Sequence, residues 1–214
     1  MNAHSSVQQL CDGAAALGVP IDAQQGARLL QLGDELIEWN QKVNLTALDT
    51  PALVLTHHLL DSLSVAPLIQ GTRVADVGTG GGFPGLPLAL LQPQRQFTLI
   101  DSVAKKLRFV DHAAQLLGLT NVQSLHARVE ALQLPPFDTV VTRAFAPLPR
   151  LLQWVAPLCD AHTCVLAMKG RWPPLPDADD AGALPRGWRL EQVQAVTVPG
   201  LDAARHILKL RRVT

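Results

Sequence analysis

The sequence predicts an α/β fold in which helices precede a mostly parallel sheet of seven strands that ends in an antiparallel hairpin. From Arg73 onward, short apolar runs alternate with helical segments, which is the pattern of a parallel sheet covered by helices on both faces. A glycine-rich turn follows the first of these runs. The last two runs are joined by a connection so short that they can pair only antiparallel. With 214 residues, 48% of them hydrophobic, the chain can bury one sizeable domain and an appendage.

The N-terminal region is predicted to be helical. One helix is expected at residues 7–17, and a second after Asp22, which forms a plausible capping pair with Gln25. The second helix has a broad apolar face. Its apolar residues recur at spacings of three and four, at Leu29, Leu32, Leu36 and Trp39. We expect residues 1–70 to form a helical N-terminal cap and residues 71–214 to form the main domain, the two making one compact unit.

A third helix completes the predicted cap. It is expected to begin at Thr50 and Pro51, a capping residue followed by the helical position at which proline is best tolerated. It would run through His57, His58 and Asp61. A histidine pair on a helix more often caps or packs than takes part in catalysis, so the sequence leaves the role of these three residues open.

Seven strands are expected in the main domain. The five parallel ones are predicted at residues 73–77, 96–100, 122–126, 139–142 and 164–168. Their apolar runs are continuous rather than alternating, as expected where helices bury both faces of a strand. The covering helices are predicted at residues 83–91, 104–117 and 148–158. After a polar, proline-rich stretch at 173–185, the hairpin strands are expected at 189–198 and 206–212.

The turn after the first strand indicates a bound ligand. Residues 74–85 have the sequence VADVGTGGGFPG, in which an apolar strand containing an acid is followed by closely spaced glycines. Glycine can take positive φ and lets main-chain N–H groups come close to a ligand, as expected for Gly78, Gly80, Gly81 and Gly82. Asp76 would repel a pyrophosphate but suits an ammonium group, such as that of S-adenosylmethionine. The alternative is a plain strand-to-helix turn.

A second fingerprint overlaps this turn. Gly80, Gly82 and Gly85 satisfy the GxGxxG pattern of dinucleotide-binding folds. Asp101, at the end of the second apolar run, suits a ribose hydroxyl in either fold, so spacing does not separate the two cofactors. Asp76, the terminal hairpin and the lack of a second domain to hold a substrate against a nicotinamide all favour S-adenosylmethionine. The predicted fold resembles the Rossmann-like class I S-adenosylmethionine-dependent methyltransferase fold.

Charge and composition narrow the functional classes. Eighteen basic and eighteen acidic side chains cancel, so binding to a nucleic acid would depend on local basic patches, such as those around Lys105, Arg143, Lys169 and Arg205. Three cysteines show no metal-binding spacing and are expected to be reduced core thiols. The sequence shows no signal-peptide pattern and no run near the roughly 20 apolar residues of a membrane span. We therefore expect a cytoplasmic protein with no metal and no membrane partner.

Six short sequence motifs occur together, and they carry a family resemblance. They are NLTA at 44–47, HHLLDSL at 57–63, VADVGTGGGFPGLPLA from Val74, LIDSVAKKLRFV from Leu99, ARVE at 127–130 and FDTVVTRAFAPL from Phe137. Over nearly its full length the chain resembles the bacterial 16S ribosomal RNA guanine-N7 methyltransferases, also called glucose-inhibited division protein B. The resemblance implies S-adenosylmethionine as methyl donor and guanine 527, in a decoding-region loop of 16S ribosomal RNA, as target. It also implies the small ribosomal subunit or its RNA as partner, and we expect a monomer.

The same resemblance implies a donor-binding site. Its positions map onto Gly78, Phe83, Val129, Glu130 and Arg143. Physical arguments add Asp76 and Gly80 in the turn and Asp101 at the ribose. Arg143 is the one residue expected to be catalytic, because its guanidinium could hold the donor's carboxylate or an RNA phosphate at the strand ends. A surface ion pair is the alternative for this arginine.

The implied reaction needs no general base. N7 of guanine carries an in-plane lone pair and no proton, so it can attack the sulfonium methyl directly, and alignment can supply on the order of 7 to 11 kcal/mol. The fourth strand is not followed by the Asn-Pro-Pro or Asp-Pro-Pro phrase of amino-methylating enzymes, and no Pro-Cys pair offers a nucleophile for pyrimidine methylation. Two other functions stay open: methylation of a small molecule, and a non-catalytic ribosome-assembly factor that senses the cofactor.

One phrase departs from the family pattern. Members usually have LDGxRH near the C-terminus, whereas this chain has LDAARH at 201–206, with Ala203 in place of glycine. If this loop needs a positive φ, the nearby Gly200 could provide it. Arg205 and His206 are candidates for RNA contact.

Overall fold

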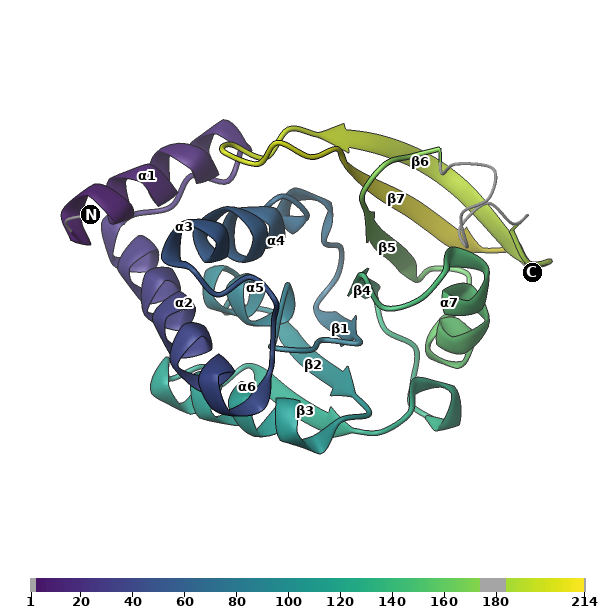
Figure 1. The fold of residues 1–214 in the computed structure, drawn as a ribbon. Coiled ribbons are helices and arrows are strands. Elements are labelled where there is room, and N and C mark those ends of the chain that lie inside the picture. The colour runs from purple at the N-terminus through teal and green to yellow at the C-terminus, as the bar shows by residue number, and fades with distance from the viewer. Residues whose placement is uncertain (1–2, 174–183, 214) are drawn as a thin grey trace.

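The computed structural model describes residues 3–173 and 184–213, and it contains a seven-stranded sheet (Figure 1). The strands are β1 Arg73–Val77, β2 Gln96–Asp101, β3 Val122–His126, β4 Thr139–Arg143, β5 Cys164–Lys169, β6 Trp188–Val196 and β7 Arg205–Arg212. Their order across the sheet is β3-β2-β1-β4-β5-β7-β6. Strands β1 to β5 pair in parallel, and β7 pairs antiparallel with β5 and β6. The predicted parallel strands and hairpin are confirmed, whereas most of the stretch at 173–185 lies outside the described residues.

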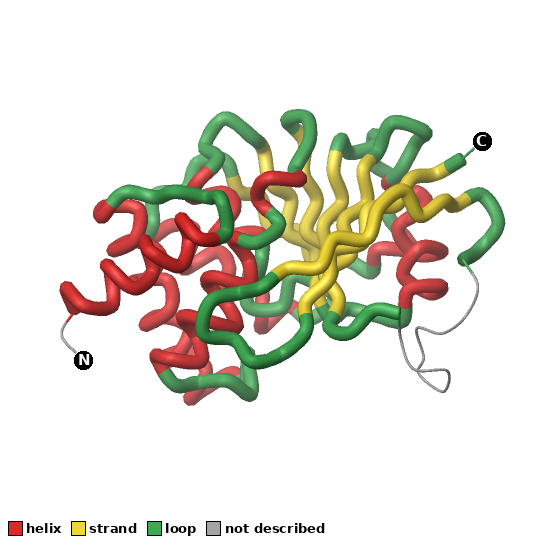
Figure 2. Tube along the Cα trace, turned by 90° about the horizontal axis from the view of Figure 1, so that it is seen from above, coloured by secondary structure: helices red, strands yellow, loops and turns green. Residues whose placement is uncertain are grey.

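Three helices that follow the strands cover the two faces of the sheet. They are α5 Gly85–Leu91, α6 Ala104–Leu116 and α7 Leu148–Val155, the last extended by the 3₁₀ segment η4 Ala156–Leu158. Helix α5 begins at Gly85 rather than at residue 83, because Phe83 and Pro84 belong to the glycine turn. In Figure 2 the strands lie between a larger and a smaller group of helices.

Side chains of the central strands alternate between two hydrophobic clusters, one on each face. In β1, Val74 packs in the cluster that contains α5 and α6, whereas Ala75 and Val77 pack in the cluster that contains α7. Strands β1, β4 and β5 are therefore buried at nearly every position. Burial on both faces explains why their apolar runs are continuous.

The first two helices are α1 Ala3–Ala16 and α2 Ala23–Val43. The predicted capping pair before α2 is confirmed. The Asp22 carboxylate accepts a hydrogen bond from Gln25 N at 2.7 Å, and the Gln25 side chain accepts one from Asp22 N at 3.0 Å. At its other end α2 stops at Asn44, whose left-handed backbone (φ 52°) turns the chain into the NLTA segment.

The third helix of the cap is continuous but changes its winding along its length. It consists of α3 Pro51–Leu53, a π-helical segment η1 Val54–Leu60 and α4 Asp61–Leu63. Thr50 caps it as predicted, since its hydroxyl accepts a hydrogen bond from Leu53 N at 3.4 Å. The π segment was not predicted, and such segments are frequent at functional sites.

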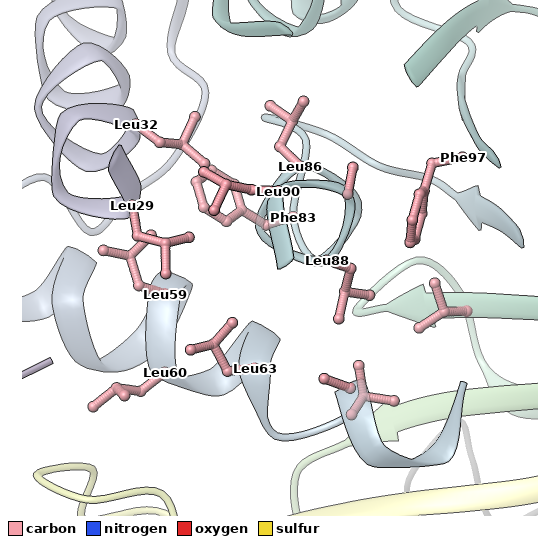
Figure 3. Close-up of a cluster of buried hydrophobic side chains, with 14 of the residues drawn as sticks. Leu29, Leu32, Leu59, Leu60, Leu63, Phe83, Leu86, Leu88, Leu90 and Phe97 are labelled. Atoms are coloured by element: carbon pink, nitrogen blue, oxygen red, sulfur yellow. The ribbon is translucent and has the colours of Figure 1, made fainter. Parts of the chain in front are cut away.

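The N-terminal helices share one hydrophobic core with the sheet. Leucines of α2, η1 and α4 surround α5 and the glycine turn, apart from Leu60, which points toward α1 (Figure 3). The labelled side chains are all buried: Leu29, Leu32, Leu59, Leu60, Leu63, Phe83, Leu86, Leu88, Leu90 and Phe97. This shared core fixes the third helix against the strand ends, so that polar groups on η1 and α4 can meet groups on the sheet. The division at residue 70 stays a prediction.

The connection between β6 and β7 returns across the N-terminal helices (Figure 1). Val198 and Leu201 belong to the same core as those helices. Gly200 has a φ of 76°, which confirms that it provides the left-handed turn that Ala203 does not. A Cβ at Gly200 would lie 3.0 Å from the Thr56 side chain, so the loop packs closely on η1. This contact brings the start of β7 close to the third helix.

Within the described residues, no helix is long and apolar enough to span a lipid bilayer. In the same part of the chain, no three histidine, cysteine, aspartate or glutamate side chains come together as a possible metal site. The three cysteines are free thiols, and Cys159 and Cys164 are buried as expected for core residues.

Candidate functional site

The glycine turn between β1 and α5 lies at the carboxyl edge of the sheet. Gly78, Gly80 and Gly82 have positive φ, whereas Gly81 does not. The N–H groups of Gly78 and Thr79 donate to Ile100 O on β2, at 2.9 and 3.1 Å. The turn is therefore fixed to the neighbouring strand. A Cβ at Gly78 would collide with the ring of Phe145, so a ring packs directly on the bare backbone at this point.

Asp76 is fully buried beneath this turn. Its Oδ2 accepts hydrogen bonds from the Thr79 hydroxyl at 2.7 Å and from Gly85 N at 2.8 Å. Its Oδ1 is buried without a hydrogen-bond partner among the described residues. Burial raises the pKa of the carboxyl to about 6. Asp76 thus braces the turn, and it lines neither cavity described below; its expected contact with a donor ammonium stays a prediction.

A smaller cavity of about 250 Å³ opens beside the turn, at the ends of β1, β2 and β3. It brings together four of the predicted donor-site residues, namely Gly78, Asp101, Val129 and Glu130. The last two belong to the 3₁₀ segment η3 Val129–Ala131. Sequence reasoning missed Trp154 and Phe145, which also line this cavity. The motif FDTVVTRAFAPL contains Phe145, but no local pattern in it indicates that this ring lies in the site.

Asp101 connects the turn to the start of α6. Its Oδ2 accepts a hydrogen bond from Gly80 N at 2.9 Å, and its Oδ1 accepts one from Val103 N at 2.9 Å. Each carboxylate oxygen has room for a second hydrogen bond, so a ribose hydroxyl could still donate to it. The predicted Gly80 thus enters the site through its backbone contact with Asp101.

A larger cavity of about 730 Å³ lies on the other side of Phe145, which lines both cavities. Its polar lining comes from η1 and α4 and from the ends of β4, β5 and β7: His57, His58, Asp61, Arg143, Lys169 and Arg205. The two cavities lie on either side of the boundary between β1 and β4, where the strand order reverses. Ligands of open α/β sheets bind at this kind of switch point.

Arg143, at the end of β4, is held from the third helix. Its Nη1 donates to His57 O at 2.8 Å and to Asp61 Oδ2 at 3.1 Å, and its Nη2 donates to His58 Nδ1 at 3.1 Å. The predicted Phe83 is buried, and its ring centroid lies 5.8 Å from the guanidinium. Arg143 therefore forms an ion pair, but an enclosed one at a cavity wall rather than a pair on the surface.

His58 is a neutral acceptor in this arrangement. Burial and the neighbouring Arg143 and His57 lower its pKa to about 3. Since Nδ1 accepts from Arg143, the proton lies on Nε2, which donates to the Thr46 hydroxyl at 2.9 Å. Three of the phrases singled out in the sequence, NLTA, HHLLDSL and TRAFAPL, thus meet in one hydrogen-bond network.

The sequence matches the profile of the family described as rRNA small subunit methyltransferase G over residues 25–208. Two curated proteins named ribosomal RNA small subunit methyltransferase G are similar over nearly the whole chain. The one from Pseudomonas syringae pv. tomato is 45% identical over 96% of this chain and 96% of that protein. The one from Azoarcus sp. is 44% identical over 95% of each.

Solved structures share the fold at lower identity. A SAM-dependent methyltransferase from Aquifex aeolicus has a TM-score of 0.56 and 18% identity, and it covers 78% of this chain and 97% of that one. A putative O-methyltransferase from Klebsiella pneumoniae has a TM-score of 0.59 and 19% identity. The match covers 86% of this chain and 90% of that one. The predicted class I methyltransferase fold is confirmed.

Proposed function

Because the chain belongs to the rRNA small subunit methyltransferase G family, we propose that it methylates N7 of guanine 527 in 16S ribosomal RNA. The donor is S-adenosylmethionine. The observation that carries the proposal is the pair of cavities that meet at Phe145, beside the switch point of the sheet. One cavity suits a nucleoside, and the other is large and lined by basic groups.

The residues of the smaller cavity fit the adenosine half of the donor. Asp101 offers a carboxylate to the ribose hydroxyls, and Val129 and Glu130 offer main-chain and side-chain groups to the adenine edge. Gly78 gives a backbone surface without a side chain, on which Phe145 packs in this structure. S-adenosylmethionine supplies an activated methyl group on a sulfonium centre.

The larger cavity fits a nucleobase with its phosphate. Its volume of about 730 Å³ is within the range of ligand sites, and its rim carries Arg143, Lys169 and Arg205. Basic side chains supply most of the affinity for the phosphate backbone of a nucleic acid. A chain with no net charge can therefore still bind RNA through this local patch.

The proposed chemistry is a direct in-line transfer in which residues position the reactants. Guanine N7 needs no deprotonation, which agrees with a neutral His58 that is already engaged by Arg143 and Thr46. Arg143 is proposed to orient one reactant through its guanidinium. Alignment alone can supply on the order of 7 to 11 kcal/mol.

The test is to map modified nucleotides in ribosomes from a strain that lacks the protein. Loss of N7-methylguanine at position 527 is expected, and unchanged modification there would contradict the proposal. Radiolabelled S-adenosylmethionine should then be offered with purified small subunits, naked RNA and a metabolite extract. Methylation in the metabolite extract alone would indicate a small-molecule enzyme, and binding without transfer would indicate an assembly factor. We propose that the protein acts as a monomer in the cytoplasm, where its ribosomal substrate is found.

A further inference from the structure

We infer that Asp61 is a positioning residue, whose buried carboxylate holds Arg143 and Arg205 together so that they bind an anionic oxygen group of a substrate in the larger cavity. The inference rests on the proposed function, since both proposed substrates carry such a group. One is a phosphate of the RNA backbone, and the other is the carboxylate of the methyl donor.

Asp61 joins three segments that are far apart in the sequence. Its Oδ2 accepts from Nη1 of Arg143 at 3.1 Å, and its Oδ1 accepts from Nε of Arg205 at 3.0 Å. The arginines are 82 and 144 residues away from it along the chain. Each carboxylate oxygen therefore fixes its own guanidinium, one at the end of β4 and one at the start of β7.

The charges in this cluster do not cancel. A single arginine can satisfy a buried carboxylate by binding both of its oxygens, yet Asp61 is placed between two. His58, which lies against Arg143, is neutral. The cluster of Asp61, Arg143 and Arg205 therefore carries a net positive charge at the wall of the larger cavity, where Lys169 lies as well. An enclosed excess of positive charge of this kind favours an anionic ligand.

Hydrogen-bond donors remain available on both arginines. Nε of Arg143 and Nη2 of Arg205 donate to no acceptor within the described ranges, 3–173 and 184–213. The two side chains are 18% and 24% exposed, and both line the larger cavity. Arginine N–H groups in fixed positions match the oxygens of a phosphate or a carboxylate.

The chain contains a matched cluster outside the cavity. Glu191 on β6 accepts hydrogen bonds from Arg189 at 2.9 Å and from Arg211 at 3.0 Å. Both arginines bind its Oε1, and Lys209 lies 3.8 Å from its Oε2, so this cluster also joins one carboxylate to basic side chains, but none of these residues lines the larger cavity. Glu191→Gln is therefore the control for any general effect of neutralising a carboxylate between two arginines.

The experiment compares Asp61→Asn, Arg205→Ala and the double variant with Glu191→Gln. Binding of 16S ribosomal RNA is measured over a series of salt concentrations, and binding of S-adenosylmethionine is measured by calorimetry. We expect Asp61→Asn and Arg205→Ala each to weaken binding of the same substrate several-fold. In the double variant the two losses should combine to less than their product, because part of the effect of Asp61 is to position Arg205.

The two binding assays together show which substrate supplies the anionic group. If it is an RNA phosphate, Arg205→Ala lowers the slope of log affinity against log salt by about 0.7 to 0.9. If it is the donor's carboxylate, affinity for S-adenosylmethionine falls and the RNA slope is unchanged. Both assays measure binding, so they remain informative even if the methylated atom is not N7 of guanine 527.

Three results would overturn the inference. The first is tighter anion binding by Asp61→Asn. It would mean that the carboxylate serves only as a counter-ion, because its neutralisation leaves more positive charge. The second is a fold-loss of affinity in the double variant that equals the product of the losses in the two single variants. It would show that Asp61 and Arg205 act separately. If Asp61→Asn does not fold, Arg205→Ala decides alone, and unchanged affinity for both substrates contradicts the role.

Discussion

Two carboxylates in this chain each accept hydrogen bonds from two arginines, but their surroundings differ. The Asp61 side chain is 4% exposed and its arginines are 18% and 24% exposed. The Glu191 side chain is 20% exposed, and its arginines, Arg189 and Arg211, are 62% and 22% exposed. Asp61 joins the third helix to two distant strands, whereas Glu191 joins residues of one hairpin.

The difference shows that environment decides what an ion pair can do. Water competes for exposed charges, so such pairs contribute about 0 to 1 kcal/mol and hold their side chains loosely. A buried carboxylate depends on its partners, because removal of one partner leaves a charge that water cannot reach. The Asp61 cluster can therefore fix both of its guanidinium groups in a site, whereas the Glu191 cluster holds Arg189 loosely.

The largest expected effect is that of Arg143→Ala on methyl transfer. The change removes the proposed catalytic contact and leaves Asp61 with Arg205 alone, so we expect single-turnover methylation of small subunits to fall by roughly 100-fold. Arg189→Ala is the control, since it takes one arginine from the exposed cluster, and it should be close to the wild type. Wild-type turnover by Arg143→Ala would remove this residue from the site.

The second prediction compares stabilities. Asp61→Ala should lower the free energy of unfolding by about 3 kcal/mol, because two partly buried arginines lose their counter-charge. Glu191→Ala should lower it by less than about 1 kcal/mol. Urea denaturation at pH 7 measures both values. Equal losses would mean that burial does not separate the two clusters.

Asp76 extends the comparison to a buried carboxylate that has no cation in contact. Asp76→Ala leaves the Thr79 hydroxyl and Gly85 N unpaired, which should cost about 1 to 3 kcal/mol of stability and weaken S-adenosylmethionine binding by loosening the turn. Asp76→Asn keeps an acceptor for both groups. Calorimetry on this variant separates two roles: affinity is retained if Asp76 braces the turn and lost if its charge holds the donor's ammonium.

The environments of Asp76 and His58 predict opposite dependences of stability on pH. The pKa of His58 is lowered from 6.5 to about 3, so the unfolded chain binds its proton more tightly and stability falls as pH falls from 6.5 toward 3. The pKa of Asp76 is raised from 3.8 to about 6, so the folded chain binds its proton more tightly and stability rises as pH falls from 6 to 3.8.

Single variants separate these two contributions. Asp76→Asn removes the contribution that stabilises the fold at low pH. As pH falls from 6 to 4, the free energy of unfolding of this variant should therefore fall more steeply than that of the wild type, by up to about 1.4 kcal/mol per pH unit. His58→Asn should fall less steeply over the same range. Urea denaturation at intervals of half a pH unit measures the slopes. Parallel curves of unfolding free energy against pH for the wild type and both variants would show that neither group titrates as its environment requires.

Much of the fold could be predicted from the sequence, because each element depends on local chemistry. The capping pair of Asp22 and Gln25, the Thr50–Pro51 start and the continuous apolar runs of β1, β4 and β5 act over a few residues. The π segment η1 could not be predicted in this way. Its winding is not encoded in a local spacing, and His57 and His58 of this segment find their partner, Arg143, on β4.

The candidate site could be predicted only in part. Gly78, Asp101, Val129 and Glu130 follow strands whose carboxyl ends meet at one edge, so topology brings them together. The sequence leaves the role of Asp61 open and makes Arg205 a candidate for RNA contact, but it does not predict their pairing, which depends on the loop at 197–204 that folds back onto the third helix. Asp76 occupies a strand end like the others, but its hydrogen bonds to Thr79 and Gly85 place it beneath the turn.

The smallest expected effect is the salt dependence of Glu191→Gln. Three cations lie near this carboxylate, at 2.9 to 3.8 Å, and they hold its pKa below the usual range. In low salt we expect Glu191→Gln to lose about 0.5 kcal/mol of stability, and in 1 M NaCl the loss should vanish, because the Debye length shrinks to about 3 Å. The loss caused by Asp61→Ala should change little over the same range, since salt screens buried charges weakly. Parallel salt dependences of the two variants would place both clusters in contact with solvent, and Asp61 could then not hold its arginines in fixed positions.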